Sequence, residues 1–247
     1  MRIPTIIGLA GPAGCGKDTV ANLLVTQARF TSLAFADSLR AEVCEAFNVN
    51  LHTFTHRPTK EESNPALALE RCLDNCFTGA MLRTVFKTFD GSVEEFMELP
   101  RSPRQIMQWW GTEFRRKRFA NYWTQTLVAR INVDQSNHQL RHVITDVRFE
   151  NEAQAVRNMG GVIWQVKRPG IEATGTHTSD VDGSQFAPDA IINNTHDIRH
   201  LQGVVMGAWL MLETGMSAQE VCDMGRAHTE LANAQWHVYN KALQVQA

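Results

Sequence analysis

Apolar residues near the amino terminus form a short run that ends in glycine-rich sequence. Residues 5–10 are β-branched at their start, which predicts a buried strand that ends in a tight turn. Apolar positions then recur at helical spacing over residues 18–27, and residues 30–35 predict a second short strand. The chain therefore opens with a predicted β-α-β unit.

Strands and helices also alternate in the second half of the chain. Residues 142–147 are apolar except for Thr145 and Asp146, which predicts a strand with polar side chains at its carboxyl end. The pattern after it predicts a helix over 151–158, strands over 162–166 and 190–192, and a helix over 198–212. We therefore predict a three-layer α/β/α fold with a mainly parallel sheet.

The remaining regions predict additions to a single domain over 1–247. Proline and glycine interrupt short amphipathic segments over 49–100, which predicts a helical insertion. Polar sequence over 168–188 is typical of a lid-like segment, and residues 216–247 predict a C-terminal helical extension. A chain of 247 residues is long enough to bury one core that carries these additions.

The clearest helix start lies at Ser102. Proline follows at the first helical position, and glutamine lies three residues after the serine cap. Three side chains at four-residue spacing share one side of the predicted helix: Arg104, Gln108 and Thr112. The pair Gly111-Thr112 predicts a break in this helix, with a new cap before Glu113.

The sequence after the first strand has the chemistry of a phosphate-binding loop. Glycines let backbone amides approach oxygens that a Cβ atom would block, and Lys17 adds a positive charge. The following helix directs its free amides and the positive end of its dipole at the same phosphates. Together they predict a nucleoside triphosphate site formed by Gly11, Ala13, Gly14, Cys15, Gly16, Lys17, Asp18 and Thr19. The alternative is a glycine-rich turn that binds nothing.

The expected metal site departs from the usual phosphate-loop pattern. Ser or Thr normally follows the lysine as a Mg²⁺ ligand, whereas this chain has Asp18 followed by Thr19. Asp18 could hold the metal through a water molecule, or Thr19 could lie close enough to bind it. Asp146, at the end of a predicted strand, either orients Mg²⁺ or its waters or caps the next turn.

Two further charged residues are candidates for the reaction centre. Arg148 shares a segment with Asp146 and could neutralise the charge of a transferring phosphoryl group. Asp37, just beyond the second predicted strand, either binds a hydroxyl of the acceptor or caps its helix.

Composition and charge exclude several other classes of protein. The formal net charge of -2 gives no general attraction to polyanions, and the basic side chains of 115–118 would point in different directions on a helix. We therefore expect no nucleic acid polymer as a partner, and we expect Trp109 and Trp110 to pack in the interior. Five cysteines without metal-binding spacing favour a reducing cytoplasm.

Membrane and export segments are also not expected. No apolar run approaches the ~20 residues that cross a bilayer, so we expect no membrane partner. The apolar run at 6–10 is short for a secretory signal and leads directly into the glycine-rich loop.

Several segments resemble the phage-type deoxynucleoside monophosphate kinases, a branch of the P-loop nucleoside monophosphate kinase group. They occur in the family's order: GCGKDT at 14–19, FADSLR at 35–40, PRQ at 103–105 with GTE at 111–113, TDVRF at 145–149 with NE at 151–152, and HTSD at 177–180. The Gly-Lys-Asp-Thr form makes Asp18 less unusual, whereas the last segment has Asp where Glu is more familiar. The resemblance covers residues 1 to about 215.

The resemblance implies transfer of the γ-phosphoryl group of ATP to a deoxynucleoside monophosphate, with Mg²⁺ as cofactor. It implies a cytoplasmic enzyme, in the host cytoplasm if phage-encoded, and suggests a homodimer. Lys17 and Arg148 are the catalytic candidates. The acceptor-binding candidates are Asp37, Arg104, Gln108, Thr112, Glu113, Asp146 and Arg148. The lid candidates are Arg168 and His177.

Three other functions are compatible with the same loop. A phosphate loop identifies the donor and not the acceptor, so a kinase of another small molecule, such as dephospho-coenzyme A, is one alternative. A switch or motor that hydrolyses ATP is the second, although the sequence has no clear sensor motif. The third is a nucleotide-binding module without catalytic activity.

Overall fold

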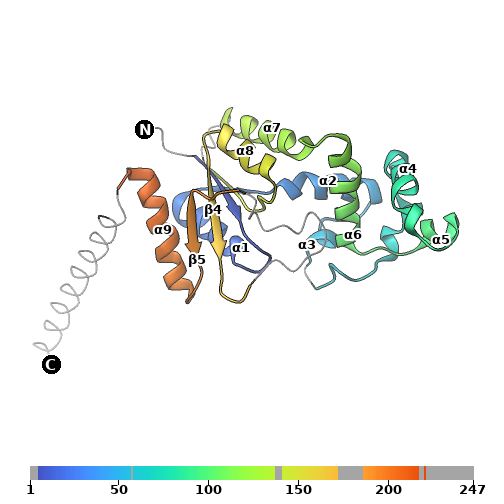
Figure 1. Ribbon diagram of the computed structural model, residues 1–247, viewed down its shortest axis with the longest axis horizontal. Coiled ribbons are helices and arrows are strands. Elements are labelled where there is room, and N and C mark those ends of the chain that lie inside the picture. Colours follow the sequence, from blue (N-terminus) through green and yellow to red (C-terminus); the bar gives the residue numbers. More distant parts are fainter. Residues whose placement is uncertain (1–4, 57, 137–140, 172–185, 217–219, 221–247) are drawn as a thin grey trace, which may run out of the picture.

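A parallel sheet forms the centre of the protein in the computed structural model, which describes residues 5–56, 58–136, 141–171, 186–216 and 220 (Figure 1). Within these residues the strand order is β2-β3-β1-β4-β5. The strands are β1 (Ile6–Ala10), β2 (Thr31–Leu33), β3 (His142–Ile144), β4 (Val162–Lys167) and β5 (Ala190–Asn193). Ile7 of β1 pairs in parallel with Val143 on one side and Val162 on the other. All five carboxyl ends therefore lie at one edge of the sheet.

Helices cover both faces of this sheet, which confirms the predicted three-layer α/β/α fold (Figure 1). One face is covered by α1 (Lys17–Ala28) and α9 (Ile198–Thr214). The other is covered by α2 (Phe35–Phe47), α7 (Tyr122–Ser136) and α8 (Glu150–Asn158). No helix in the described ranges has both the length and the hydrophobicity needed to cross a membrane.

Each face of the sheet has its own hydrophobic core, because successive side chains of a strand point to opposite sides. Ile6 is fully buried in a core with Val43 and Val156, from α2 and α8. Its neighbour Ile7 is fully buried in the second core, with Leu24 of α1 and Trp209 of α9. The apolar run of β1 is thus explained by burial on both faces.

Short helices lie between α2 and α7 in the chain, and they extend from beside α2 to the end of the folded domain that is far from β5 (Figure 1). They are α3 (His52–Thr55), η1 (Pro65–Leu67), η2 (Leu69–Arg71), α4 (Asn75–Thr84), η3 (Phe86–Thr88), α5 (Val93–Glu98), α6 (Pro103–Gln108) and η4 (Trp109–Arg116). The ring of Phe77 in α4 lies 4.6 Å from that of Trp110 and 5.5 Å from that of Phe114, between centroids. Trp110 is 1% exposed and Trp109 packs against the same core, so both tryptophans pack as predicted.

The helix that begins after Ser102 is longer than the sequence predicts. The Ser102 hydroxyl caps it as expected, but the helix widens into the π-helical turn η4 instead of breaking at Gly111. The Gly111 carbonyl accepts a hydrogen bond from Trp123 Nε1 at 3.1 Å, and a Cβ atom on Gly111 would lie 3.2 Å from Leu39. The predicted break was therefore wrong, because this glycine serves close packing against α2 and α7.

Two predicted additions fall largely outside the described residues. Of the lid-like segment 168–188, the structure describes 168–171 and 186–188. Of the C-terminal extension 216–247, it describes residues 216 and 220.

Glu42 of α2 joins three elements on the second face of the sheet. Its Oε2 accepts hydrogen bonds from Trp110 Nε1 at 2.7 Å and from Arg115 Nε at 2.8 Å. Its Oε1 accepts a hydrogen bond from the Tyr122 hydroxyl at 2.6 Å. One carboxylate therefore holds α2 against η4 and α7.

Replacing Glu42 with Ala is expected to lower the free energy of unfolding by roughly 2 kcal/mol, because Trp110 and Arg115 lose a shared acceptor in a partly buried site. Glu45→Ala changes an exposed residue of the same helix, and its effect should stay within about 0.5 kcal/mol. Urea denaturation followed by tryptophan fluorescence measures both. Equal losses in the two variants would contradict the stabilising role of Glu42.

Candidate functional site

The glycine-rich loop lies at the carboxyl edge of the sheet, between β1 and α1. Gly11 and Gly16 have φ angles of 136° and 107°, which side chains other than glycine rarely adopt. A Cβ atom on Gly11 would lie 2.5 Å from the Val166 carbonyl oxygen, and one on Gly16 would lie 2.5 Å from Asn194 Nδ2. Both glycines are therefore required by conformation and by space.

Lys17 begins α1 and folds back over the loop. Its Nζ donates hydrogen bonds to the carbonyl oxygens of Gly11 at 2.6 Å and Pro12 at 2.8 Å. Burial lowers the pKa of Lys17, and the positive charge of Arg148 lowers it further. Because the first amides of α1 have no partner within the helix, the ammonium group and these amides together form a site suited to a polyphosphate.

Cys15 and Asn194 hold the glycine-rich loop in place against the rest of the protein. The Cys15 side chain is fully buried in the core under α1, and burial raises the pKa of its thiol. Asn194, directly after β5, donates from Nδ2 to the Cys15 carbonyl oxygen at 2.9 Å. Sequence reasoning missed Asn194, because this contact joins residues that are far apart in the chain.

Asp146 follows β3 and caps a helix that is distant in sequence. Its Oδ1 accepts from the backbone amide of Phe35 at 2.8 Å, and its Oδ2 accepts from that of Ala36 at 2.9 Å. Burial raises the pKa of the carboxyl group, while these hydrogen bonds and the charges of Arg148 and Arg40 oppose the rise. The predicted capping role is thus found at α2 and not at the turn after Asp146.

Asp37 is the third residue of α2 and lies three positions after the N-cap residue Ala34. Helix α2 begins at Phe35, so the prediction that Asp37 is the cap residue was wrong in position. Its Oδ2 accepts from the Ala34 amide at 2.9 Å, and its Oδ1 pairs with Arg40 at 3.0 Å. Asp37 therefore stabilises the start of α2 from within the first turn.

The charges of several cations from separate segments act on Lys60, and we call these residues the Lys60 cluster. Burial lowers the pKa of Lys60, and Arg104, Arg148 and Arg40 lower it further, against an opposing effect of Glu61. The Arg104 amide donates to the Lys60 carbonyl oxygen at 3.0 Å, and its guanidinium pairs with Glu61 at 3.1 Å. The structure therefore brings together two predicted arginines, 104 and 148, with two cations that sequence reasoning missed.

Those two missed cations differ in the signal that they offered. Arg40 is the last residue of the FADSLR segment, and its partly buried side chain pairs with Asp37. The Arg40 Nε is buried and finds no hydrogen-bond partner among the described residues. Lys60 lies in an irregular segment and carried no signal in the sequence.

Arg148 acts on both the glycine-rich loop and Lys60. Its positive charge lowers the pKa of Lys17 and also that of Lys60. Its backbone amide donates to Glu152 Oε2 at 2.8 Å. Arg148 thus links the electrostatics of the two lysines.

The other predicted residues are distributed around the site. Gln108 and Thr112 are half-buried on α6 and η4, and Glu113 forms an ion pair with Lys117. Arg168 is exposed after β4. His177 lies outside the described residues.

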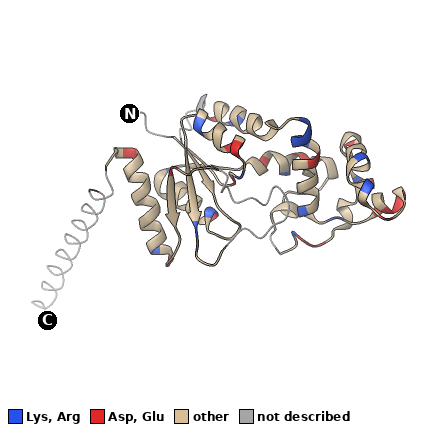
Figure 2. Cartoon of the chain, viewed as in Figure 1, with Lys and Arg blue, Asp and Glu red and all other residues tan. Residues whose placement is uncertain are grey.

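The basic run at 115–118 lies where η4 leads into α7 (Figure 2). Arg115 binds Glu42 and Arg116 binds Glu152. The Arg118 guanidinium lies 5.6 Å from the centre of the Phe114 ring. These contacts support the packing interpretation of the run over a nucleic-acid surface.

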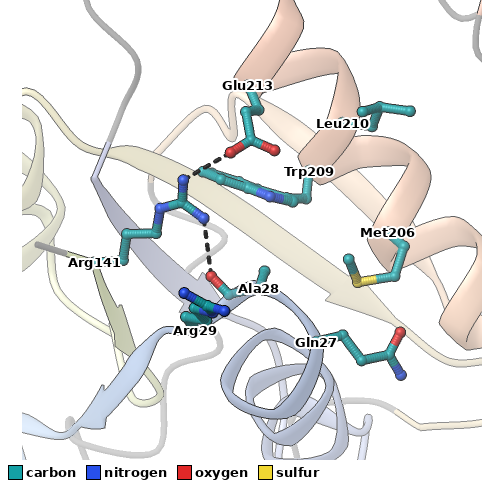
Figure 3. Close-up of a pocket in the computed structure, with 8 residues that line it drawn as sticks. All are labelled: Gln27, Ala28, Arg29, Arg141, Met206, Trp209, Leu210 and Glu213. Atoms are coloured by element: carbon teal, nitrogen blue, oxygen red, sulfur yellow. Dashed lines mark hydrogen bonds and ion pairs between the residues drawn. The ribbon is translucent and has the colours of Figure 1, made fainter.

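A separate hollow of about 330 Å³ lies near the end of α1 (Figure 3). It is lined by Gln27, Ala28, Arg29, Arg141, Met206, Trp209, Leu210 and Glu213. Arg141 precedes β3, so this hollow is at the sheet edge opposite the phosphate loop. The Arg141 guanidinium donates to the Ala28 carbonyl oxygen at 3.0 Å and to Glu213 at 2.7 Å, and it lies over the Trp209 ring. The Arg141 charge is thus balanced within the protein.

Comparison with known proteins identifies the family. The family model described as deoxynucleotide monophosphate kinase matches residues 74–205, which is more than half of the chain. The protein belongs to the deoxynucleotide monophosphate kinase family. The matched region of this family member includes Arg104, Asp146 and Arg148, but it does not include the glycine-rich loop.

Two similar proteins accompany this family match. A protein of Acanthamoeba polyphaga mimivirus with the provisional name deoxynucleotide monophosphate kinase is 26% identical, over 72% of this chain and 81% of the relative. The solved structure of dephospho-CoA kinase from Campylobacter jejuni aligns with a TM-score of 0.41 and 14% identity, over 85% of this chain and 98% of that one.

Replacing Gly16 with Ala is expected to weaken ATP binding at least about tenfold, because the new Cβ atom would collide with Asn194 and strain a backbone with positive φ. Gly203→Ala in α9 is the matched control, since a Cβ atom there meets nothing within 4 Å. Titration with a fluorescent ATP analogue measures both affinities. Unchanged affinity in the Gly16 variant would contradict the assigned role of the loop.

Proposed function

We propose that this protein transfers the γ-phosphoryl group of ATP to the 5′-phosphate of a deoxynucleoside monophosphate, giving a deoxynucleoside diphosphate and ADP. The observation that carries the proposal is that the charge of Arg148 acts both on Lys17 of the loop and on Lys60, which also feels Arg104 and Arg40. Two polyanions that repel each other need such a bridge of positive charge in order to react. Membership of the deoxynucleotide monophosphate kinase family supports this acceptor class.

The proposal gives each cation a part in the transfer. Lys17 and the loop amides bind the β- and γ-phosphates of ATP, and Arg148 stabilises the charge of the transferring group. Lys60, Arg104 and Arg40 hold the phosphate of the acceptor. An acceptor oxygen then forms a bond to the γ-phosphorus while the bond to the bridging oxygen of ADP breaks. No strong base is needed, because the attacking phosphate oxygen is already anionic.

The remaining predicted residues have proposed roles around the acceptor. Asp37, Gln108, Thr112 and Glu113 lie on α2, α6 and η4, the helices that carry Arg40 and Arg104. We assign them to the sugar and base of the acceptor. Arg168 and His177 are assigned to a lid over the phosphates, where they would help to exclude water.

Mg²⁺ belongs to this proposal as an ion that enters with ATP. The described residues contain no group of three or more His, Cys, Asp or Glu that could hold a metal by themselves, so phosphate oxygens and waters would supply most ligands. Asp18 and Thr19 are exposed at the start of α1 and fit such a site. Asp146 would contact the ion through a water molecule, since both of its carboxylate oxygens already accept backbone hydrogen bonds. When bound, the ion neutralises charge on the β- and γ-phosphates.

The direct test is an ADP-release assay with ATP and Mg²⁺ against each deoxynucleoside monophosphate, the ribonucleotides and dephospho-coenzyme A, with the diphosphate product identified. We expect turnover with one or more deoxynucleoside monophosphates. Replacing Lys17 with Ala should lower kcat at least about 100-fold, because the positive charge that neutralises the β- and γ-phosphates is lost. Lys87→Ala, an exposed change on η3, is the control and should leave kcat unchanged. ATP hydrolysis without transfer to any acceptor would refute the proposal.

The Lys60 cluster generates a second prediction about the acceptor alone. Replacing Lys60 with Ala should raise the KM for the deoxynucleoside monophosphate about tenfold, while the KM for ATP changes less than about twofold. The control is Arg71→Ala, an exposed cation on η2. Steady-state kinetics with each substrate varied in turn separates the two constants. A rise in the KM for ATP alone would place Lys60 on the donor side.

A further inference from the structure

The segment that carries Asp146 and Arg148 is held in place by Glu152 of α8. Glu152 is 2% exposed, and its Oε2 accepts from the backbone amides of Arg148 at 2.8 Å and Phe149 at 3.2 Å. Its Oε1 accepts a hydrogen bond from the guanidinium of Arg116. Burial raises the pKa of the Glu152 carboxyl group, and the charge of Arg116 opposes this rise. Glu152 thus fixes the backbone at Arg148.

Arg116 belongs to the helix on the opposite side of the site. It ends η4, which continues directly from α6, and the first turn of α6 carries Arg104. The Arg116 guanidinium also lies 4.1 Å from the centre of the Phe149 ring. Nearby, Asn151 Nδ2 donates to the Ala120 carbonyl oxygen at 3.0 Å. The two segments that bear Arg104 and Arg148 are therefore joined at this point.

A helix-capping role alone does not account for the pair. Capping explains why Oε2 faces the amides before α8, but it needs no partly buried arginine on the other oxygen. A buried ion pair contributes little net stability compared with apolar side chains of similar size, because both charges lose their hydration. What this pair supplies is a fixed geometry between η4 and the segment after β3.

We propose that Glu152 and Arg116 are positioning residues for phosphoryl transfer, which hold Arg148 at a fixed spacing from Arg104 across the site. The proposal rests on the proposed function. Neither residue needs to touch a substrate: Glu152 acts on the Arg148 backbone, and Arg116 anchors Glu152 to the helix that carries Arg104. A displacement of about 1 Å at a reacting group can cost about 100-fold in rate.

The first test is the Glu152→Gln variant, which keeps the size of the side chain and one acceptor oxygen but removes the charge. It should lower kcat at least about tenfold, with the KM for ATP changed less than about twofold. Glu150→Gln is the matched control, because Glu150 lies exposed in the first turn of the same helix. The control should keep the wild-type kcat.

A double-mutant cycle separates positioning from general damage. If Glu152 acts through Arg148, the variant with both Glu152→Gln and Arg148→Ala should have the same residual kcat as Arg148→Ala alone. Losses that multiply would overturn the proposal while leaving the kinase function intact. Arg116→Met provides a second variant for the same cycle, with the same expected result, if Glu152→Gln folds poorly.

Hydrogen exchange gives a readout that does not depend on turnover. In Glu152→Gln the amides of Arg148 and Phe149 should exchange faster than in the wild type, because their shared acceptor is weakened, and Glu150→Gln should not change them. Unchanged exchange in Glu152→Gln would refute the positional role directly. A wild-type protein that transfers phosphate to no acceptor would instead refute the proposed function, whatever the exchange result.

Discussion

The capping of α2 by Asp146 is the contact on which the geometry of the site depends. The Asp146 carboxylate accepts hydrogen bonds from two backbone amides at the start of α2, the helix that carries Arg40. Arg148 lies two residues after Asp146 in the segment that follows β3. The cost of burying this charge is offset by the two hydrogen bonds and by the fields of both arginines. Without the carboxylate, the two amides would lose their acceptors, and the positions of Arg40 and Arg148 relative to each other would no longer be fixed by this contact.

Burial and neighbouring positive charges act on both lysines of the site. The pKa of Lys17 and that of Lys60 are both lowered, chiefly by burial and then by neighbouring positive charges. Such lowering means that the charged forms are disfavoured where they lie. An anionic ligand would favour the charged forms again, so both lysines are suited to bind a polyanion. The same constraint explains why Asp37 and Glu61 each pair with one arginine of the group.

Local signals in the sequence predicted most of the fold, whereas long-range contacts were not predictable from it. The first strand, the loop and α1 follow from one another in sequence, and Ser102 caps its helix as expected. The break at Gly111 was wrong because the same glycine signal marks both helix ends and close helix packing. Lys60 and Asn194 were missed because their partners lie in other segments, so no spacing in the chain reveals them.

Charge density along the chain also proved a poor guide to the site. The adjacent residues Arg115 and Arg116 have structural roles, because each forms an ion pair with a carboxylate on a different helix. The cations that gather around Lys60 are instead single residues from separate segments, brought together because the carboxyl ends of parallel strands and the helices beside them meet at one edge. A run of basic residues on one helix spreads its charges around the helix, while a fold can aim separated charges at one point. The site is therefore a product of the topology, and its chemistry follows from which segments the sheet brings together.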